Sequence, residues 1–114
     1  MAMTRLAIAE SYPKDATMSG VRTVTTVIAK AGQEATVKTL MAEVAELARQ
    51  ELGCLRYDLW QGHANPAEFM IIGEWQDEAA FQAYYRSSYL EELMREILDI
   101  VAHPPDVQWY TWVA

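Results

Sequence analysis

The chain has 114 residues, a length typical of one domain that folds around its own core without disulfides or metal ions. Sixteen acidic against nine basic residues give a net charge of −7, and the basic residues are scattered singly, which disfavours binding to nucleic acid or to anionic membranes. One cysteine, Cys54, excludes an internal disulfide and fits a reducing cytoplasm.

Residues 1–20 are predicted to form an arm ahead of the domain proper, which is expected to span residues 21–114. Polar residues, Pro13 and Gly20 mark this stretch, and it lacks the continuous apolar region of a secretion signal. The arm is either a partly disordered terminus or a segment that packs on a partner subunit. No segment approaches the length of a membrane span.

The domain is expected to begin with a strand at Val21–Ala29, because β-branched residues fill this stretch almost throughout. From Gln33 to Gln50 the apolar residues recur on one helical stripe, which predicts an amphipathic helix. Gly53 is expected to end that helix, since glycine readily adopts the left-handed conformation found at helix C-termini.

Two further strands are predicted at Leu55–Gln61 and Phe69–Trp75, joined as an antiparallel hairpin by the turn residues Gly62–Pro66. Alternation in the first of these strands puts Leu55, Tyr57 and Leu59 on one face and Arg56, Asp58 and Trp60 on the other. Glu74, near the end of the second, is expected to pair across the sheet with Arg56 or Lys30.

Asp77 occupies the position of a helix N-cap, and the short helix that follows carries Phe81 and Tyr84. Arg86–Ser88 interrupts this helix, after which a second apolar stripe continues from Leu90 to Val101. Two prolines then prevent further helix, and Val107–Val113 predicts a closing strand.

The element order is therefore β-α-β-β-α-β. Short connections and right-handed crossovers fold this order most simply as an α+β, ferredoxin-like sandwich, a four-stranded antiparallel sheet with helices on one face. Large apolar residues occupy both faces of the middle strands, so the open face is not expected to be fully solvated. We predict a homodimer that pairs through this open sheet face as a dimeric α+β barrel.

Several sequence segments resemble those of a known protein family: Glu51–Tyr57, the Pro66 hairpin, Glu74–Phe81 and the strand after Pro104-Pro105. Together, over residues 21–113, they resemble the antibiotic biosynthesis monooxygenase-like (ABM) family of small dimeric α+β barrels. The resemblance implies a scaffold used for cofactor-free oxygenation of quinols and polyketide aromatics, and for haem degradation.

The resemblance also implies site positions. Trp75 matches a tryptophan that holds an aromatic substrate in oxygenase members, whereas Tyr84 and Tyr89 stand where many members have histidines. Haem-degrading members use an asparagine on the first strand, where this chain offers threonines, so haem cleavage is not expected. Ile71 replaces a further asparagine of the polyketide oxygenases, and any activity must rest on different polar groups.

An aromatic-lined pocket between helices and sheet is the site that these residues favour. Trp75 and Tyr84 are the candidate catalytic residues. Tyrosine hydroxyls can hydrogen-bond a phenol or quinone oxygen while aromatic rings stack on the ligand. For a tyrosine to act as a base at neutral pH, a neighbour such as Arg86 would have to lower its pKa. The candidate substrate-binding residues are Tyr57, Phe81, Tyr89 and Arg86. Core packing is the alternative role for the aromatic members of this set.

No phosphate-binding loop and no usable spacing of metal ligands occurs, so no cofactor and no metal is expected. His63 and His103 are expected to be solvated loop residues, and Cys54 an inert thiol. The leading interpretation is a cofactor-independent monooxygenase acting on a small aromatic or quinone-like molecule. The alternatives are a non-enzymatic dimer that binds a small hydrophobic ligand in the same pocket, and a protein whose sheet and terminal aromatics serve assembly alone.

Overall fold

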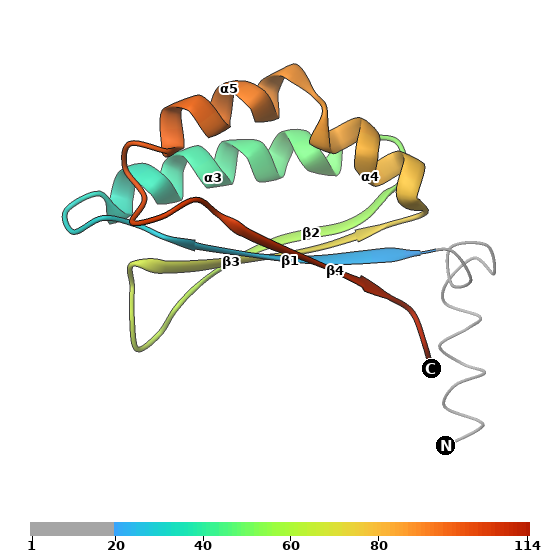
Figure 1. Cartoon of the computed structure of the whole chain (residues 1–114), viewed down its shortest axis with the longest axis horizontal. Coiled ribbons are helices and arrows are strands. Elements are labelled where there is room, and N and C mark those ends of the chain that lie inside the picture. The colour runs from blue at the N-terminus through green and yellow to red at the C-terminus, as the bar shows by residue number, and fades with distance from the viewer. Residues whose placement is uncertain (1–19) are drawn as a thin grey trace.

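The computed structural model describes residues 20–114, so the predicted arm lies outside the described residues apart from Gly20. The predicted order of elements is confirmed in this part of the chain (Figure 1). The helices and strands are β1 (Val21–Ile28), α3 (Glu34–Arg49), β2 (Cys54–Gln61), β3 (Glu68–Trp75), α4 (Glu78–Tyr85), α5 (Ser88–Ile97) and β4 (Asp106–Thr111).

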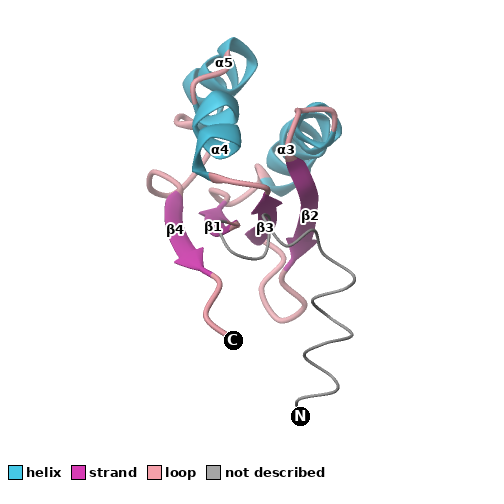
Figure 2. Ribbon diagram, turned by 90° about the vertical axis from the view of Figure 1, so that its right-hand side faces the viewer, coloured by secondary structure: helices cyan, strands magenta, loops and turns pink. Residues whose placement is uncertain are grey.

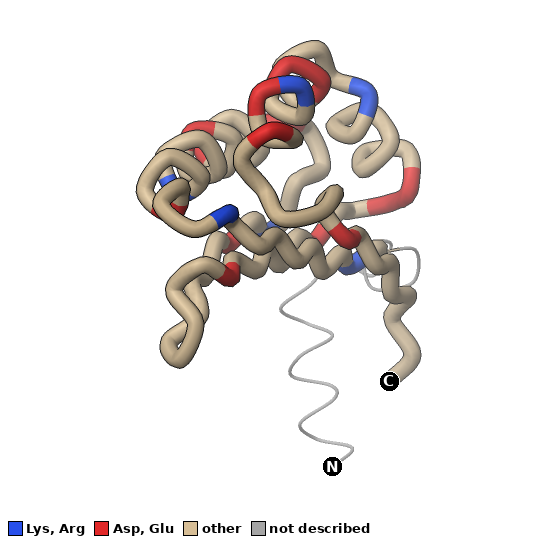
Figure 3. The backbone as a smooth tube through the Cα atoms, turned by 60° about the vertical axis from the view of Figure 1, so that its left-hand side comes forward, with Lys and Arg blue, Asp and Glu red and all other residues tan. Residues whose placement is uncertain are grey.

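The four strands form one antiparallel sheet in the order β2-β3-β1-β4. All the helices cover one face of this sheet, and the other face is left open in the described chain (Figures 1 and 2). This arrangement confirms the ferredoxin-like α+β sandwich. In the view of Figure 3, lysines and arginines are scattered among acidic residues on the helical layer, so this side presents no continuous basic surface.

The core lies between the helices and the sheet. Helix α3 buries its apolar stripe, residues Val37, Met41, Val44, Ala45 and Ala48, against residues that β1 and β3 point toward the helices. Helix α5 adds Leu90, Leu93 and Ile97. It ends at Ile97, before the predicted end at Val101, because the chain turns there and Val101 instead forms an isolated bridge with Ala29, the residue after β1.

Two polar caps hold the aromatic helix α4 in place. Asp77 is the N-cap, as predicted, and its Oδ1 accepts a hydrogen bond from the Ala80 amide at 2.8 Å. At the other end the Ser87 hydroxyl donates to the Tyr84 carbonyl at 2.6 Å, which satisfies a helix-terminal carbonyl and lets α5 start in a new direction. The predicted interruption between the two helices is therefore confirmed.

The sheet departs from the predicted alternation at the start of β2. The pairing of β2 with β3 shifts between Cys54 and Arg56, which is the signature of a β-bulge. Leu55 is the extra residue: it is 42% exposed and borders a hollow on the open face, whereas Tyr57 is buried under the helices. The prediction that Leu55 shares the face of Tyr57 is wrong, because a bulge resets the two-residue alternation.

The role predicted for Gly53 also changes. Helix α3 ends four residues earlier, at Arg49, and Gly53 lies in the turn that leads into β2. Its φ of +85° is in the left-handed region that favours glycine. Its carbonyl accepts a hydrogen bond from the Gln76 amide at 2.7 Å, so this turn fixes the start of β2 beside the entry to α4.

Candidate functional site

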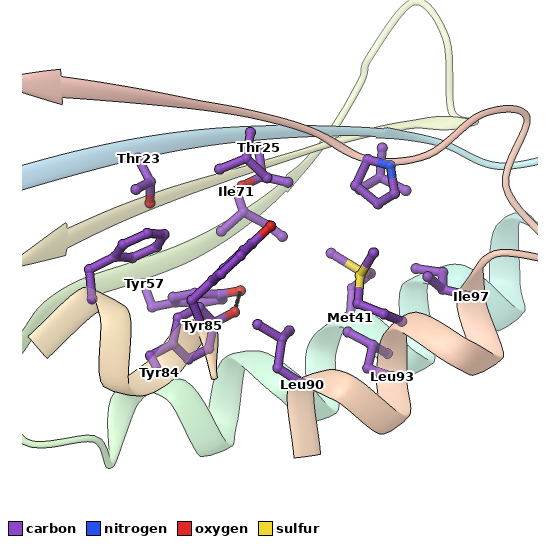
Figure 4. A pocket seen from close by; sticks show the side chains of 15 residues that line it. Thr23, Thr25, Met41, Tyr57, Ile71, Tyr84, Tyr85, Leu90, Leu93 and Ile97 are labelled. Atoms are coloured by element: carbon purple, nitrogen blue, oxygen red, sulfur yellow. Dashed lines mark hydrogen bonds between the residues drawn. The ribbon is translucent and has the colours of Figure 1, made fainter. Parts of the chain in front are cut away.

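A small cavity lies between the sheet and helices α3, α4 and α5 (Figure 4). Its volume is about 70 Å³. The lining is mostly apolar, and its polar groups are the hydroxyls of threonines on β1 and of tyrosines on β2 and α4 (Figure 4). The residues that the argument uses are Thr23, Thr25, Met41, Tyr57, Tyr84 and Tyr85.

Two tyrosines in the cavity wall are joined by a hydrogen bond. Tyr57 comes from β2 and Tyr84 from α4, and their hydroxyl oxygens are 2.7 Å apart, a hydrogen bond in which either can be the donor. The two side chains are only 4% and 5% exposed. One of the two hydroxyl hydrogens is always left over by this mutual bond, so the pair can still donate one hydrogen bond to a ligand in the cavity.

Trp75 stands behind this pair and not in the cavity wall itself. It is fully buried, and its ring stacks on that of Tyr84 with centroids 4.8 Å apart. Phe81 contacts the tryptophan edge to face at 5.9 Å and also lines the cavity. The structure therefore brings together four of the predicted site residues, Trp75, Phe81, Tyr84 and Tyr57, in one aromatic cluster.

The other two predicted residues lie apart from the cavity. Tyr89 is the second residue of α5, and its hydroxyl donates to a carboxylate oxygen of Glu51 at 2.9 Å. Its ring centroid is 6.2 Å from that of Tyr84, and it packs against the core without lining the cavity. Arg86 is the exposed C-cap residue of α4 and does not line the cavity either.

Burial controls the ionisation of the tyrosine pair. Loss of hydration raises the pKa of Tyr57 to about 12, although the bond from Tyr84 lowers it in part. Burial raises the pKa of Tyr84 well above its ordinary value, and the neighbouring Tyr57 adds to the effect. The lowered pKa that a tyrosine base would require is therefore not found at either residue, and both phenols remain protonated at neutral pH, where they act as hydrogen-bond donors and not as bases.

Tyr85, which is not among the predicted site residues, is the exposed member of the cavity wall. Its side chain is 51% exposed, and its ring stacks on Phe81 with centroids 5.5 Å apart. This places Tyr85 at the mouth of the cavity. Its position could have been found from the sequence. Tyr85 follows Tyr84 on a short amphipathic helix, so it must lie about 100° around the helix axis from the buried residue, at the border of the apolar stripe.

A larger hollow of about 480 Å³ lies on the open face, at the end of the sheet where β1 begins. Its lining includes Leu55, Tyr110 and Trp112 together with an ion-pair cluster. In that cluster Glu74 pairs with Arg22, and Arg56 Nη1 lies 3.9 Å from the same carboxylate oxygen. The predicted pairing of Glu74 with Arg56 is confirmed. Pairing with Lys30 is wrong, because its Nζ donates to the Asp99 carbonyl.

The remaining candidate groups do not gather into a second site. His63 and His103 are exposed in loops, as expected, and Cys54 is half-buried, where burial raises the pKa of its thiol. Residues 20–114 contain no group of three or more histidine, cysteine, aspartate or glutamate side chains that could hold a metal ion. In the same range, none of the helices is sufficiently long and apolar to cross a membrane.

The fold and the aromatic cavity define a class, the ferredoxin-like α+β proteins whose helices and sheet enclose a small apolar site. The sequence profile described as antibiotic biosynthesis monooxygenase matches residues 20–96, which is more than half of the chain. The chain therefore belongs to the antibiotic biosynthesis monooxygenase family. This confirms the resemblance inferred from the sequence.

Solved structures agree on the fold. A conserved protein from Methanosarcina mazei is 21% identical with a TM-score of 0.80, over 87% of this chain and 98% of that chain. A protein described as an antibiotic biosynthesis monooxygenase is 26% identical with a TM-score of 0.77, over 82% of this chain and 99% of the other. A candidate monooxygenase of the same description from Deinococcus radiodurans is 22% identical with a TM-score of 0.78, over 82% and 93%. Among proteins of curated function none matches this chain.

Proposed function

We propose that this protein is a cofactor-independent monooxygenase that acts on a small aromatic or quinol-type substrate in the cavity between helices and sheet. The observation that carries the proposal is the buried pair of tyrosine hydroxyls, 2.7 Å apart, on the wall of an otherwise apolar cavity. Membership of the monooxygenase family supports the same class of chemistry. The single cysteine, unpaired within the chain, fits action in the cytoplasm.

The substrate itself is the reductant in this proposal. An ionised anthrone or quinol passes one electron to dioxygen, and the resulting radical pair combines to a hydroperoxide at a ring carbon that carries hydrogen. Loss of water turns that carbon into a carbonyl, so an anthrone gives an anthraquinone and a quinol gives a hydroxyquinone. Because the tyrosines stay protonated, they donate a hydrogen bond to the anionic substrate oxygen and stabilise its charge in a site that excludes water. The enzyme is therefore expected to prefer substrates that ionise readily on their own.

The size of the cavity requires it to open when a substrate enters. An apolar cavity that accepts benzene has a volume of roughly 150 Å³, about twice the 70 Å³ found here. Tyr85, half exposed at the mouth, can swing outward at the cost of its stacking contact with Phe81 alone among the ring contacts of residues 20–114. Met41 and Met94 in the wall are flexible side chains that can repack around a ligand.

Oxygen uptake by the purified protein with a panel of quinols and anthrones, and with no added cofactor, tests the proposal. We expect uptake above the buffer rate, and a loss of about tenfold or more in kcat/KM for Tyr84→Phe, which removes one of the paired hydroxyls. Tyr110→Phe is the matched control, because Tyr110 is exposed on β4 and does not line the cavity. Equal rates with and without protein for every substrate would contradict the enzymatic proposal.

A non-enzymatic ligand-binding dimer is the second candidate. The raised pKa values of Tyr57 and Tyr84 favour it, because neither phenol can take a proton from a substrate at neutral pH. Saturable binding of a quinone with no oxygen uptake from the corresponding quinol would establish this candidate over the first.

We further propose that two copies pair through the open sheet face. Apolar side chains on that face are exposed in the single chain, among them Trp60 at 58% and Met70 at 37%, which the register places opposite each other on β2 and β3. Burying such a pair favours association. Light scattering at micromolar concentration should give twice the mass of one chain, and Trp60→Glu should shift the protein toward the monomer. A monomeric wild-type protein would contradict the pairing.

A further inference from the structure

Two exposed aromatic rings lie at one side of the cavity. Tyr85 of α4 lines the cavity and is half exposed, and Trp109 of β4 is 44% exposed. Both contact the ring of Phe81, Tyr85 by stacking and Trp109 edge to face with ring centroids 4.5 Å apart. Phe81 itself is buried, so the two exposed rings cover a single buried one, one from the helical layer and the other from the sheet.

The register of the sheet places Trp109 next to the cavity. Trp109 lies opposite Thr23 of β1, and Val107 lies opposite Thr25. Thr23, Thr25 and Val107 all line the cavity, and Trp109 lies just beyond this lining. Trp109 and Val107 are two residues apart and therefore share one face of β4. The contact between Trp109 and Phe81 shows that this face is directed toward the helices.

The cavity opens to solvent along the same side of the molecule. Its lining residues from α3, β2 and β3 are all buried. The lining residues that are partly or fully exposed come from the other elements and from the chain leading into β4: Thr25, Tyr85, Met94, Pro105 and Val107. Within residues 20–114 β4 is an edge strand, and α4 lies above it (Figure 2). A ligand that extends beyond the cavity therefore leaves between α4 and β4, beside Tyr85 and Trp109.

We propose that Tyr85 and Trp109 form an outer subsite, which binds the second ring of a fused aromatic ligand while the first ring, with its oxygen, occupies the cavity. This inference rests on the proposed function, and it makes Trp109 a specificity-determining residue.

The size of the cavity favours this division of the ligand. A cavity that accepts the single ring of benzene has roughly 150 Å³, and the volume here is about 70 Å³. The cavity must open even for one ring, so a fused second ring lies outside it. Tyr85 swings outward as the first ring enters, and then lies beside the second ring. Aromatic side chains contribute stacking and edge-to-face attraction beyond the burial of apolar area, so the subsite favours fused over single-ring ligands.

Phenol and 1-naphthol test the subsite, because they share one hydroxyl and differ by one fused ring. Their dissociation constants are measured at pH 7 without oxygen, by titrations followed in NMR spectra of the purified protein. Trp109→Leu should weaken 1-naphthol binding about fivefold and leave phenol binding within about twofold of the wild type. Trp112→Leu is the matched control, because Trp112 is 45% exposed but lines the hollow on the open face, and both affinities should stay those of the wild type.

A second readout follows Trp109 directly. Its indole N–H resonance, assigned by its loss in Trp109→Leu, should move when 1-naphthol saturates the wild-type protein and stay in place with phenol. An equal loss of affinity for both ligands in Trp109→Leu would overturn the subsite, because Trp109 would then affect only the cavity. An unchanged 1-naphthol affinity would overturn it as well, and either result leaves the proposed function standing. If neither ligand binds the wild-type protein, the subsite and the aromatic substrate class fall together.

Discussion

Replacing Gly53 by alanine should lower the free energy of unfolding by about 2–4 kcal/mol. Two costs add. The φ of +85° forces a side chain into the left-handed region, and a Cβ atom there would lie 2.6 Å from the Cβ of Ala80 on helix α4. Because both the turn and the helix are tied to the end of β3, neither can retreat freely. Urea denaturation of the two proteins measures the difference.

Gly32 provides the matched control. It has the same φ of +85°, but a Cβ atom there would meet nothing within 4 Å. Gly32→Ala should therefore show the backbone cost alone, about 1–2 kcal/mol. The steric part of the Gly53 effect is the difference between the two variants. Equal losses for both would show that the close approach of Gly53 to helix α4 contributes nothing.

Raising the pH from 10 to 12 should cost the folded protein about 2 kcal/mol through Tyr57. In the unfolded chain a tyrosine releases its proton near pH 10, whereas burial holds the pKa of Tyr57 at about 12 in the folded state. The unfolded state therefore binds fewer protons over this interval, and stability falls as pH rises. The contribution is fully present below pH 10. The raised pKa of Tyr84 acts in the same direction.

Urea denaturation at pH 8, 10 and 11.5 checks this dependence, with Tyr57→Phe as the comparison. The variant should be less stable than the wild type at pH 8, because the hydroxyl of Tyr84 loses its partner. It should lose less stability than the wild type on going to pH 11.5. Parallel curves for the two proteins would show that the Tyr57 phenol is not protected from ionisation.

The regular elements could be predicted because their local signals agree with the final packing. The stripe of α3 and the Asp77 cap each depend on residues close in sequence, and the structure places both within a residue or two of the prediction. The position of Leu55 could not be predicted. The β-bulge at Leu55 arises from the pairing of β2 with β3. The alternation of apolar and polar residues along β2 alone does not reveal it.

The candidate site could likewise be predicted only in part. Tyr57, Phe81 and Tyr84 lie on strand and helix faces that their own periodicity orients toward the core, and these faces meet around Trp75. Arg86 follows the last helical turn of α4, so its direction depends on how the chain leaves the helix, and it points to solvent. The close packing of Thr23 and Trp75 against Gly73 was beyond prediction, because β1 and β3 bring these residues together only through the register of the sheet.

The most direct test of the central claim is the position of a bound quinone or quinol in a crystal structure of the complex. We predict its ring between the helices and the sheet, with an oxygen within hydrogen-bond distance of the Tyr57–Tyr84 pair and Tyr85 displaced outward. The larger hollow on the open sheet face is the competing location. A ligand found there against Tyr110 and Trp112, with the 70 Å³ cavity unchanged, would contradict the account.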